Sequence, residues 1–218
     1  MRMPGDKSFA IIGVGNIGRI LLNRLLASGV PAENLVICDS DPGRASSVAR
    51  QFGVHPISLS DEATCTADVV LVAVPPKAVP DLLGTVGKWL RPGQLVISFA
   101  AAIPLERLES LLPVEVMVVR VMPNAPSLVR QGMNPVAYGR RVTLEGRALV
   151  EAILACLGET IEVSDDLMNW CVGLSGAAMR SLLPALEGMT QAGIEAGLQE
   201  NDARSIAAQV MLGMAALV

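Results

Sequence analysis

The residues whose types and spacing best suit chemistry form a short motif, Gly13-Val14-Gly15-Asn16-Ile17-Gly18. An apolar run ends just before this motif, an amphipathic segment begins within it, and Asp39 closes the next apolar run. In such a context the first glycine permits a tight turn, the second leaves the backbone open to a pyrophosphate, and the third lets the helix pack close to the strand. The free N–H groups at the helix start would face the phosphates. The pattern predicts a dinucleotide site; the alternative is a glycine-rich turn with no ligand.

Asp39 bears on which dinucleotide the site would take. A carboxylate at the end of the second strand suits the two ribose hydroxyls of NAD and repels the 2′-phosphate of NADP. Arg44, five residues further on, could bind that phosphate, and Asp39 could instead cap a turn in Asp39-Ser40-Asp41-Pro42. We expect NAD(P)H as the cofactor, with a preference for NADH.

Further cofactor contacts are expected from the loops that follow the strands, because ligands of open α/β sheets bind at the carboxyl ends of the strands. Small residues in these loops would allow close approach, although they could equally be packing residues under a turn. Ser60 could cap a helix or contact the adenine. The candidates outside the glycine motif are Asp39, Ser40, Ser60, Ala73, Val74, Pro75, Pro76, Phe99, Ala100, Ala101 and Asn124.

The remaining reactive side chains exclude several kinds of site. His55 is the only histidine, so a multi-histidine metal site cannot form and a Ser-His-Asp site could be built only around this residue. The four cysteines form no C-x-x-C pair, which favours buried thiols in a reducing compartment over disulfides or a zinc site. We therefore expect no bound metal.

Charge and hydropathy narrow the expected partners. The formal net charge is -4, and the absence of a basic stripe argues against a nucleic-acid partner. No apolar run reaches the roughly 18 residues that span a bilayer, and the polar start, Met1–Lys7, lacks a signal-peptide core. We expect a cytoplasmic protein that binds neither nucleic acid nor membrane.

Apolar runs alternate with helical patterns from Ser8 to about Val163, which is typical of a doubly wound parallel sheet. The expected strands are Ser8–Ile12, Asn34–Cys38, Asp68–Val74, Gln94–Phe99 and Val116–Met122. The expected helices are Asn16–Ser28, Gly43–Phe52, Lys77–Leu90, Leu105–Leu111 and Leu144–Leu157. These elements predict an α/β fold of the Rossmann type over residues 1–163.

From Ser164 onward the strand patterns stop, which predicts a small all-helical domain over residues 164–218. The expected helices there are Asp165–Cys171, about Ala177–Leu198, and Asp202 to the end. Ile206–Val218 is apolar apart from Gln209, and a helix that is apolar all round must be buried all round. So short a domain cannot enclose this helix alone, so we expect a homodimer or a higher homo-oligomer.

Several longer stretches match one family. The most specific is Val119-Arg-Val-Met-Pro-Asn-Ala-Pro-Ser-Leu-Val129, followed by Gly132-Met133 and later by Val172-Gly-Leu-Ser-Gly176. The others are Gly13–Gly18, Ala73–Pro76, Ser98–Ala101, Glu187–Met189, Ala192–Ile194 and Gly197–Leu198. In these residues the chain resembles the pyrroline-5-carboxylate reductase family over nearly its whole length. The resemblance implies a domain that binds NAD(P)H, a helical domain that interlocks with a partner subunit, and reduction of 1-pyrroline-5-carboxylate to L-proline.

The inventory of side chains suits that chemistry. Reducing a ketone generates an alkoxide and calls for a positioned acid, usually a histidine or a lysine. A protonated cyclic imine already carries its proton, so its reduction needs mainly orientation of the two reactants. The chain has no histidine or lysine after Lys88, which fits imine reduction better than a hydroxy-acid dehydrogenase.

Three departures from the family pattern bear on activity. Met179 and Arg180 stand where the family has slimmer residues, and together they could reshape or block the substrate pocket. Arg180 could instead grip a different carboxylate or be a solvated helix residue. The chain ends before the Ser-Pro-Gly-Gly-Thr-Thr region with which the family holds the substrate carboxylate, so it looks truncated. Asp39-Ser40 replaces an Asn-Arg-like pair that suits NADP. The substrate-side candidates are Ser175, Gly176 and Arg180, and no residue is assigned to catalysis.

Two alternatives to pyrroline-5-carboxylate reduction stay open at this point. A relative that kept the dinucleotide site but lost catalysis could act as a dinucleotide-binding or regulatory module. A pocket remodelled around Arg180 could instead reduce another imine or a keto substrate.

Overall fold

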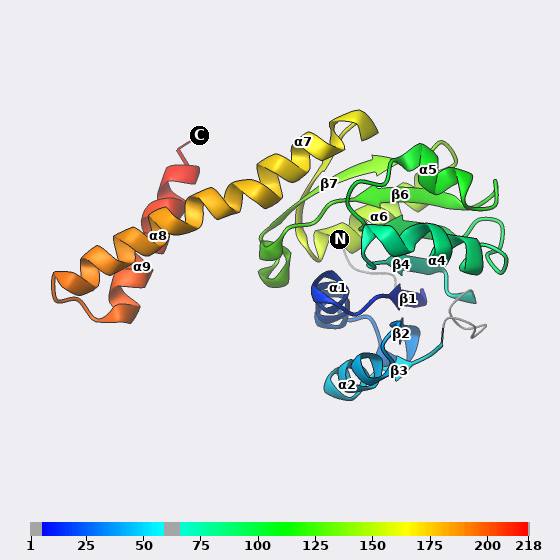
Figure 1. Cartoon of the computed structure of the whole chain (residues 1–218), viewed down its shortest axis with the longest axis horizontal. Helices are drawn as coiled ribbons and strands as arrows, with labels where there is room; N and C mark the ends of the chain where they lie inside the picture. Colours follow the sequence, from blue (N-terminus) through cyan, green and yellow to red (C-terminus); the bar gives the residue numbers. More distant parts are fainter. Residues whose placement is uncertain (1–5, 59–65, 218) are drawn as a thin grey trace. The chain divides into compact units, whose positions relative to one another are not determined.

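The computed structural model describes residues 6–58 and 66–217, and Ser60 therefore lies outside the described residues. The chain divides into two compact units, Met1–Cys171 and Val172–Val218 (Figure 1). The sequence places its boundary before Ser164, where the strand pattern stops. Both divisions separate the sheet from the last two helices.

The first unit is built on a sheet with the strand order β3-β2-β1-β4-β5-β6-β7-β8. All neighbouring strands are parallel except β6 and β7, which are antiparallel. The strands in the described part of the chain are β1 (Phe9–Ile12), β2 (Leu35–Cys38), β3 (His55–Pro56), β4 (Val69–Val72), β5 (Leu95–Ser98), β6 (Met117–Val121), β7 (Gly132–Tyr138) and β8 (Gly158–Glu162). The order reverses at β1, which has β2 on one side and β4 on the other. Such a switch point is where open α/β sheets bind ligands.

Helices cover both faces of this sheet, as its buried strands require. Residues of α1 (Asn16–Ala27), α2 (Pro42–Phe52) and α6 (Leu144–Ala155) share one core cluster with β1. Residues of α4 (Val79–Val86) and α5 (Leu105–Ser110) form a second cluster with β4 and β5. The remaining elements of this unit are the 3₁₀ turns η1 (Ala32–Asn34), η2 (Pro76–Ala78), η3 (Ala125–Val129) and η4 (Asp165–Leu167), and all but the last residue of α7 (Met168–Val172).

The register brings the ends of four strands level. Ile12 pairs with Cys38 on one side and with Val72 on the other, and Val72 pairs with Ser98. The residues that follow these strand ends therefore lie along one edge of the sheet. The fold in this way brings together loops that are up to 86 residues apart in the sequence, counted from Gly13 to Phe99.

The short edge strand β3, two longer strands and one helix differ from the expected elements. β7 contains Gly132, Asn134 and Pro135, which are disfavoured in strands, and β8 is a mostly exposed edge strand that carries two glutamates. Neither segment has the continuous apolar run that marks β1, β2, β4, β5 and β6, so the sequence predicts neither of them, nor the antiparallel pairing of β6 with β7. The helix expected over Lys77–Leu90 is shorter and begins as a 3₁₀ turn.

The second unit consists of a π-helical turn, η5 (Gly173–Ala177), and two helices, α8 (Ala178–Glu195) and α9 (Glu200–Ala215). The two helices lie side by side (Figure 1). Ala203 and Ala207 are the buried residues of α9, whereas α8 has none. Among the described residues of the whole chain, no helix is both long and apolar enough to cross a membrane.

Candidate dinucleotide-binding site

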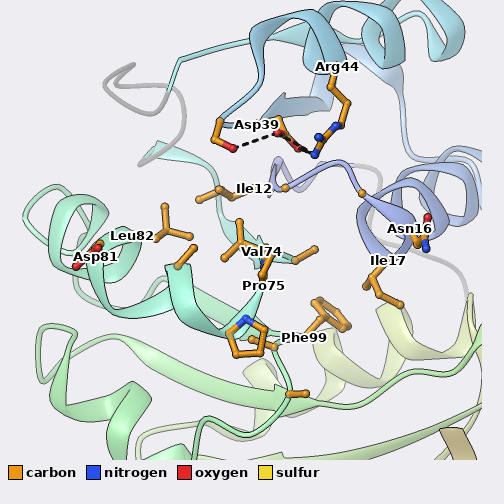
Figure 2. A pocket seen from close by; sticks show the side chains of 18 of the residues that line it. Ile12, Asn16, Ile17, Asp39, Arg44, Val74, Pro75, Asp81, Leu82 and Phe99 are labelled. Carbon is orange, nitrogen blue, oxygen red and sulfur yellow. Dashed lines mark hydrogen bonds and ion pairs between the residues drawn. The ribbon is translucent and has the colours of Figure 1, made fainter. Parts of the chain in front are cut away.

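A cleft of about 600 Å³ lies at the carboxyl ends of β1, β2, β4 and β5 (Figure 2). Its walls come from the loops that follow these four strands and from the starts of α1 and α2. Thirteen of the residues that the sequence predicts as cofactor contacts line it: Gly13, Gly15, Asn16, Ile17, Asp39, Ser40, Ala73, Val74, Pro75, Pro76, Phe99, Ala100 and Ala101. The structure therefore brings most of the predicted set into one cleft.

The other predicted residues that the structure describes do not line this cleft. Val14 and Gly18 are buried beneath the loop, where they support it. Asn124 precedes η3, and its side-chain oxygen accepts a hydrogen bond from the backbone N–H of Met133 at 3.0 Å. The substrate-side candidates Ser175, Gly176 and Arg180 belong to the second unit.

The three glycines of the motif have different surroundings. Gly13 has a φ of +92°, and a Cβ there would lie 2.7 Å from the carbonyl oxygen of Ala73. A Cβ on Gly18 would collide with the carbonyl oxygen of Gly13. A Cβ on Gly15, in contrast, would meet no atom within 4 Å. The fold thus requires glycine at the first and third positions, while the second faces open space at the start of α1.

The start of α1 supplies hydrogen-bond donors to this open space. The helix begins at Asn16, and no side chain caps it. The first backbone N–H groups of a helix have no partner within the helix, and the helix dipole makes this end favourable for an anion. The open position of Gly15 and these donors together fit a pyrophosphate.

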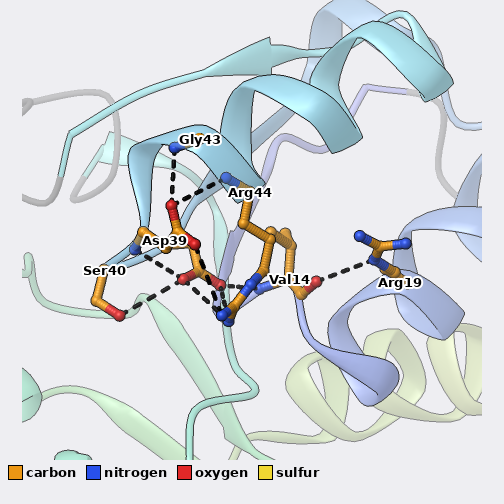
Figure 3. A network of polar contacts seen from close by, with 7 residues as sticks. Val14, Arg19, Asp39, Ser40, Gly43 and Arg44 are labelled. Atoms are coloured by element: carbon orange, nitrogen blue, oxygen red, sulfur yellow. Dashed lines mark hydrogen bonds and ion pairs between the residues drawn. The ribbon is translucent and has the colours of Figure 1, made fainter.

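Asp39 is held in the cleft wall by a network of polar contacts (Figure 3). Its Oδ2 accepts a hydrogen bond from the backbone N–H of Val14 at 2.9 Å, and its Oδ1 accepts one from the N–H of Asp41 at 3.0 Å. Nη1 of Arg44 lies 3.4 Å from Oδ1. The Asp39 side chain is only 5% exposed, whereas that of Arg44 is 47% exposed. A nearly buried carboxylate therefore lies at the end of β2, beside the half-exposed guanidinium of Arg44.

Asp39 caps the turn in Asp39-Ser40-Asp41-Pro42 that the sequence offers as an alternative, and Asp41 caps the helix α2 that follows. Oδ1 of Asp41 accepts hydrogen bonds from the N–H groups of Gly43 at 2.9 Å and Arg44 at 3.2 Å. Asp41 is thus the N-cap, while Asp39 accepts from the residue two positions ahead, as in an Asx turn. The turn and the ligand interpretations of Asp39 are compatible, because the carboxylate serves the turn while lining the cleft.

Sequence reasoning missed five lining residues, Ile12, Ala78, Asp81, Leu82 and Thr85. All but Ile12 lie on or just before α4, at the three- and four-residue spacings that share one helix face. That spacing is a signal in the sequence. The sequence does not show, however, that this face lines the cleft; that follows from the packing of α4 against β4 in the tertiary structure.

The cleft offers binding groups rather than an acid or base. Among the lining residues that the structure describes there is no histidine and no lysine, and the charged ones are Asp39, Arg44 and Asp81. Burial, and secondarily the charge of Asp39, raises the pKa of the adjacent Cys38 thiol to about 11, so this thiol stays protonated at neutral pH. Within the described part of the chain, no cluster of three or more histidine, cysteine or acidic residues could hold a metal ion.

Two family models match the chain. Residues 8–102 match the family described as NADP oxidoreductase, coenzyme F420-dependent. Residues 165–218 match the pyrroline-5-carboxylate reductase dimerisation family. The first match covers the four loops of the cleft, and the second covers α8 and α9.

Curated proteins and solved structures are similar over nearly the whole chain. The pyrroline-5-carboxylate reductase of Escherichia coli is 32% identical over 98% of this chain and 80% of its own length. That of Mycobacterium leprae is 34% identical over 96% of this chain and 72% of its own length. The structure of a pyrroline-5-carboxylate reductase from Coxiella burnetii has a TM-score of 0.85 at 27% identity, covering 97% of this chain and 79% of that one.

Proposed function

The chain belongs to the pyrroline-5-carboxylate reductase family, and from this membership we propose that it reduces 1-pyrroline-5-carboxylate to L-proline with NAD(P)H. The observation that carries the proposal is the combination of similarity over 98% of the chain with a cleft at the switch point of the sheet. Its glycine loop leaves room for a pyrophosphate at Gly15.

The residues of the cleft would bind and orient the cofactor. Gly15 and the first N–H groups of α1 would hold the pyrophosphate, and Asp39 would accept hydrogen bonds from the adenosine ribose. The bound dinucleotide supplies the hydride. Small residues after β4 and β5, such as Ala73 and Ala100, would permit its close approach to the strand ends. A lining without histidine or lysine suits a protonated imine, which brings its own proton.

We further propose that NADH is the preferred cofactor. Asp39 and Asp41 face one cation, Arg44, at this corner of the cleft. A 2′-phosphate would therefore meet a locally negative surface, whereas two ribose hydroxyls would meet acceptors. Replacing Asp39 by alanine should weaken NADH binding more than NADPH binding, measured by titration of cofactor fluorescence. A larger loss for NADPH would reverse the proposed preference.

The reductase activity is tested by following NADH oxidation with and without the imine. We expect oxidation that depends on 1-pyrroline-5-carboxylate. Binding of NADH without any oxidation would contradict the reductase proposal and would support the second candidate, a dinucleotide-binding or regulatory module. The observation that favours this second candidate is the pair of bulky residues Met179 and Arg180, which follow the Leu174-Ser-Gly176 stretch closely.

A substrate other than pyrroline-5-carboxylate is tested through Arg180. This residue is exposed on α8 and could grip a substrate carboxylate. A panel of cyclic imines and keto acids should be assayed with the wild type and with Arg180→Ala. Unchanged kinetic constants in the variant would exclude a role for this side chain in choosing the substrate.

We propose a homodimer, or a higher homo-oligomer, formed through α8 and α9. The match of residues 165–218 to a dimerisation family supports this, as do exposed apolar side chains of α9 such as Ile206 and Val210. The molar mass in solution, measured by light scattering, tests the assembly.

We also propose a cytoplasmic location, since the buried free thiols of Cys38 and Cys156 suit a reducing compartment. Fractionation of cells tests that location.

A further inference from the structure

We propose that Arg44 sets how strongly this site discriminates between NADH and NADPH, by exchanging the Asp39 carboxylate for a 2′-phosphate. This inference rests on the proposed use of NAD(P)H and concerns the same cleft. It assigns to one side chain a role that the similarity to relatives leaves open.

The backbone fixes the Asp39 carboxylate, but nothing comparable fixes the side chain of Arg44. The N–H groups of Val14 and Asp41 hold the two carboxylate oxygens at 2.9 and 3.0 Å. Nη1 of Arg44 approaches the same oxygens at the longer distances of 3.4 and 3.5 Å. The Arg44 side chain is also about half exposed. The Ser40 hydroxyl also donates to Oδ1 of Asp39 at 3.5 Å. Arg44 is therefore the charged partner of Asp39 that can leave when a ligand arrives.

Arg44 is also the cation that a 2′-phosphate would find. It is the only lysine or arginine among the residues that line the cleft in the described structure. The first N–H groups of α2 cannot replace it, because those of Gly43 and Arg44 already donate to Asp41. The carboxylate of Asp41 lies 3.8 Å from Nη2 of Arg44. Without Arg44, a phosphate here would face two carboxylates and no cation from the described residues that line the cleft.

The two cofactors should therefore depend on Arg44 in different ways. The ribose hydroxyls of NADH donate to Asp39 and compete with Arg44 for a carboxylate that has about four acceptor positions. Removing Arg44 leaves the donors of Val14, Asp41 and Ser40 in place and frees the acceptor capacity that Arg44 occupied. The 2′-phosphate of NADPH instead gains a charge-assisted bond from Arg44 and loses it in the variant. A general loss of positive charge would act differently, weakening both cofactors alike through their shared pyrophosphate.

The test compares dissociation constants of NADH and NADPH for the wild type, Arg44→Ala and Arg50→Ala. Arg50 is an exposed arginine in the last turn of the same helix and serves as the matched control. In Arg44→Ala we expect the Kd of NADPH to rise roughly ten- to a hundredfold, the loss of one hydrogen bond to a charged group. We expect the Kd of NADH to stay within about threefold of the wild type or to fall, and Arg50→Ala to change neither.

The outcomes separate this inference from the proposed function. A wild type that binds neither dinucleotide overturns the proposed function, and the inference with it. Equal losses of NADH and NADPH affinity in Arg44→Ala, or no loss of either, overturn the role of Arg44 alone. Arg44→Gln keeps most of the side-chain length without the charge, and the same selective loss of NADPH affinity in this variant would assign the effect to charge.

Discussion

The two units of this chain bury their apolar residues to very different degrees. Every residue of β1, β4 and β5 is buried. In α8, an 18-residue helix, no residue is buried, and α9 buries only Ala203 and Ala207. The first unit therefore has a core of its own, whereas the apolar side chains of the second unit need cover from elsewhere. One chain in this way combines a unit that has its own core and a cleft with a unit whose apolar side chains are largely exposed.

The first unit also holds a buried charge pair that the second unit lacks. Arg120 on β6 is almost fully buried, and its Nη1 lies 2.7 Å from Oδ1 of Asp165. Its Nη2 donates to Asn169 at 3.2 Å, and Oδ2 of Asp165 accepts from the backbone N–H of Leu105 at 2.8 Å. This pair ties a central strand to α5 and to the start of α7, so its loss should be costly.

The largest expected effect is on the stability of the first unit. Arg120→Met should lower the free energy of unfolding by about 3 kcal/mol, because it leaves a partly buried carboxylate without its partner. The matched control is Arg147→Met, which breaks an exposed pair with Glu162 at nearly the same distance, 2.8 Å. This control should cost less than about 1 kcal/mol. If urea denaturation showed equal losses of unfolding free energy in the two variants, the buried ion pair would be no more important for stability than the exposed one, contrary to this prediction.

The next largest effect separates binding from folding within the glycine motif. Gly15→Val should weaken NADH binding at least about a hundredfold, because its side chain would occupy the space left for the pyrophosphate. Its thermal stability should stay close to that of the wild type, since the position faces open space. Gly18→Ala should instead lower the Tm, because its Cβ would strike the backbone of Gly13. Unaltered NADH binding by Gly15→Val would refute the placement of the pyrophosphate.

A smaller effect is expected on self-association when a charge is placed on the exposed apolar surface of α9 in the second unit. Ile206, Val210 and Met214 are exposed at four-residue intervals along α9. Val210→Glu should weaken self-association about tenfold or more, by placing a charge on a surface that association would bury. Val114→Glu changes an exposed valine of the first unit and is the control. Sedimentation at several concentrations measures both, and an unchanged equilibrium in Val210→Glu would argue against association through α9.

The smallest effect concerns a surface charge of the first unit. Burial tends to raise the pKa of Asp68, but hydrogen bonds from Ser8 and the charge of Lys7 outweigh it, so the pKa is lowered overall. The charged form therefore stabilises the fold above the unfolded-state pKa, and this contribution is lost as the pH falls through the depressed value. Asp68→Asn should be less stable than the wild type by under about 1 kcal/mol at neutral pH. In acid, the two proteins should become equally stable. A difference in unfolding free energy that grew as the pH fell would contradict the lowered pKa of Asp68 in the folded protein.

Much of the fold could be predicted from the sequence because the signals are local. Continuous apolar runs predicted β1, β2, β4, β5 and β6, with ends that differ from the observed ones by one or two residues at most. The Rossmann-type sheet and the helical character of the second unit are confirmed. β7 and β8 could not be recognised in the same way, since their residues suit strands poorly and become strands through pairing with β6 and with each other.

The sequence by itself determined the glycine loop, the aspartate after the second strand and the order of the elements, because each depends on residues close together in the chain. Only the tertiary structure decided that Val14 would hold Asp39, that one face of α4 would complete the cleft, and that Arg120 would be buried against Asp165. These contacts join segments far apart in the sequence, and their geometry follows from strand register and helix packing. Neither the register of the strands nor the packing of the helices can be read from a local sequence pattern.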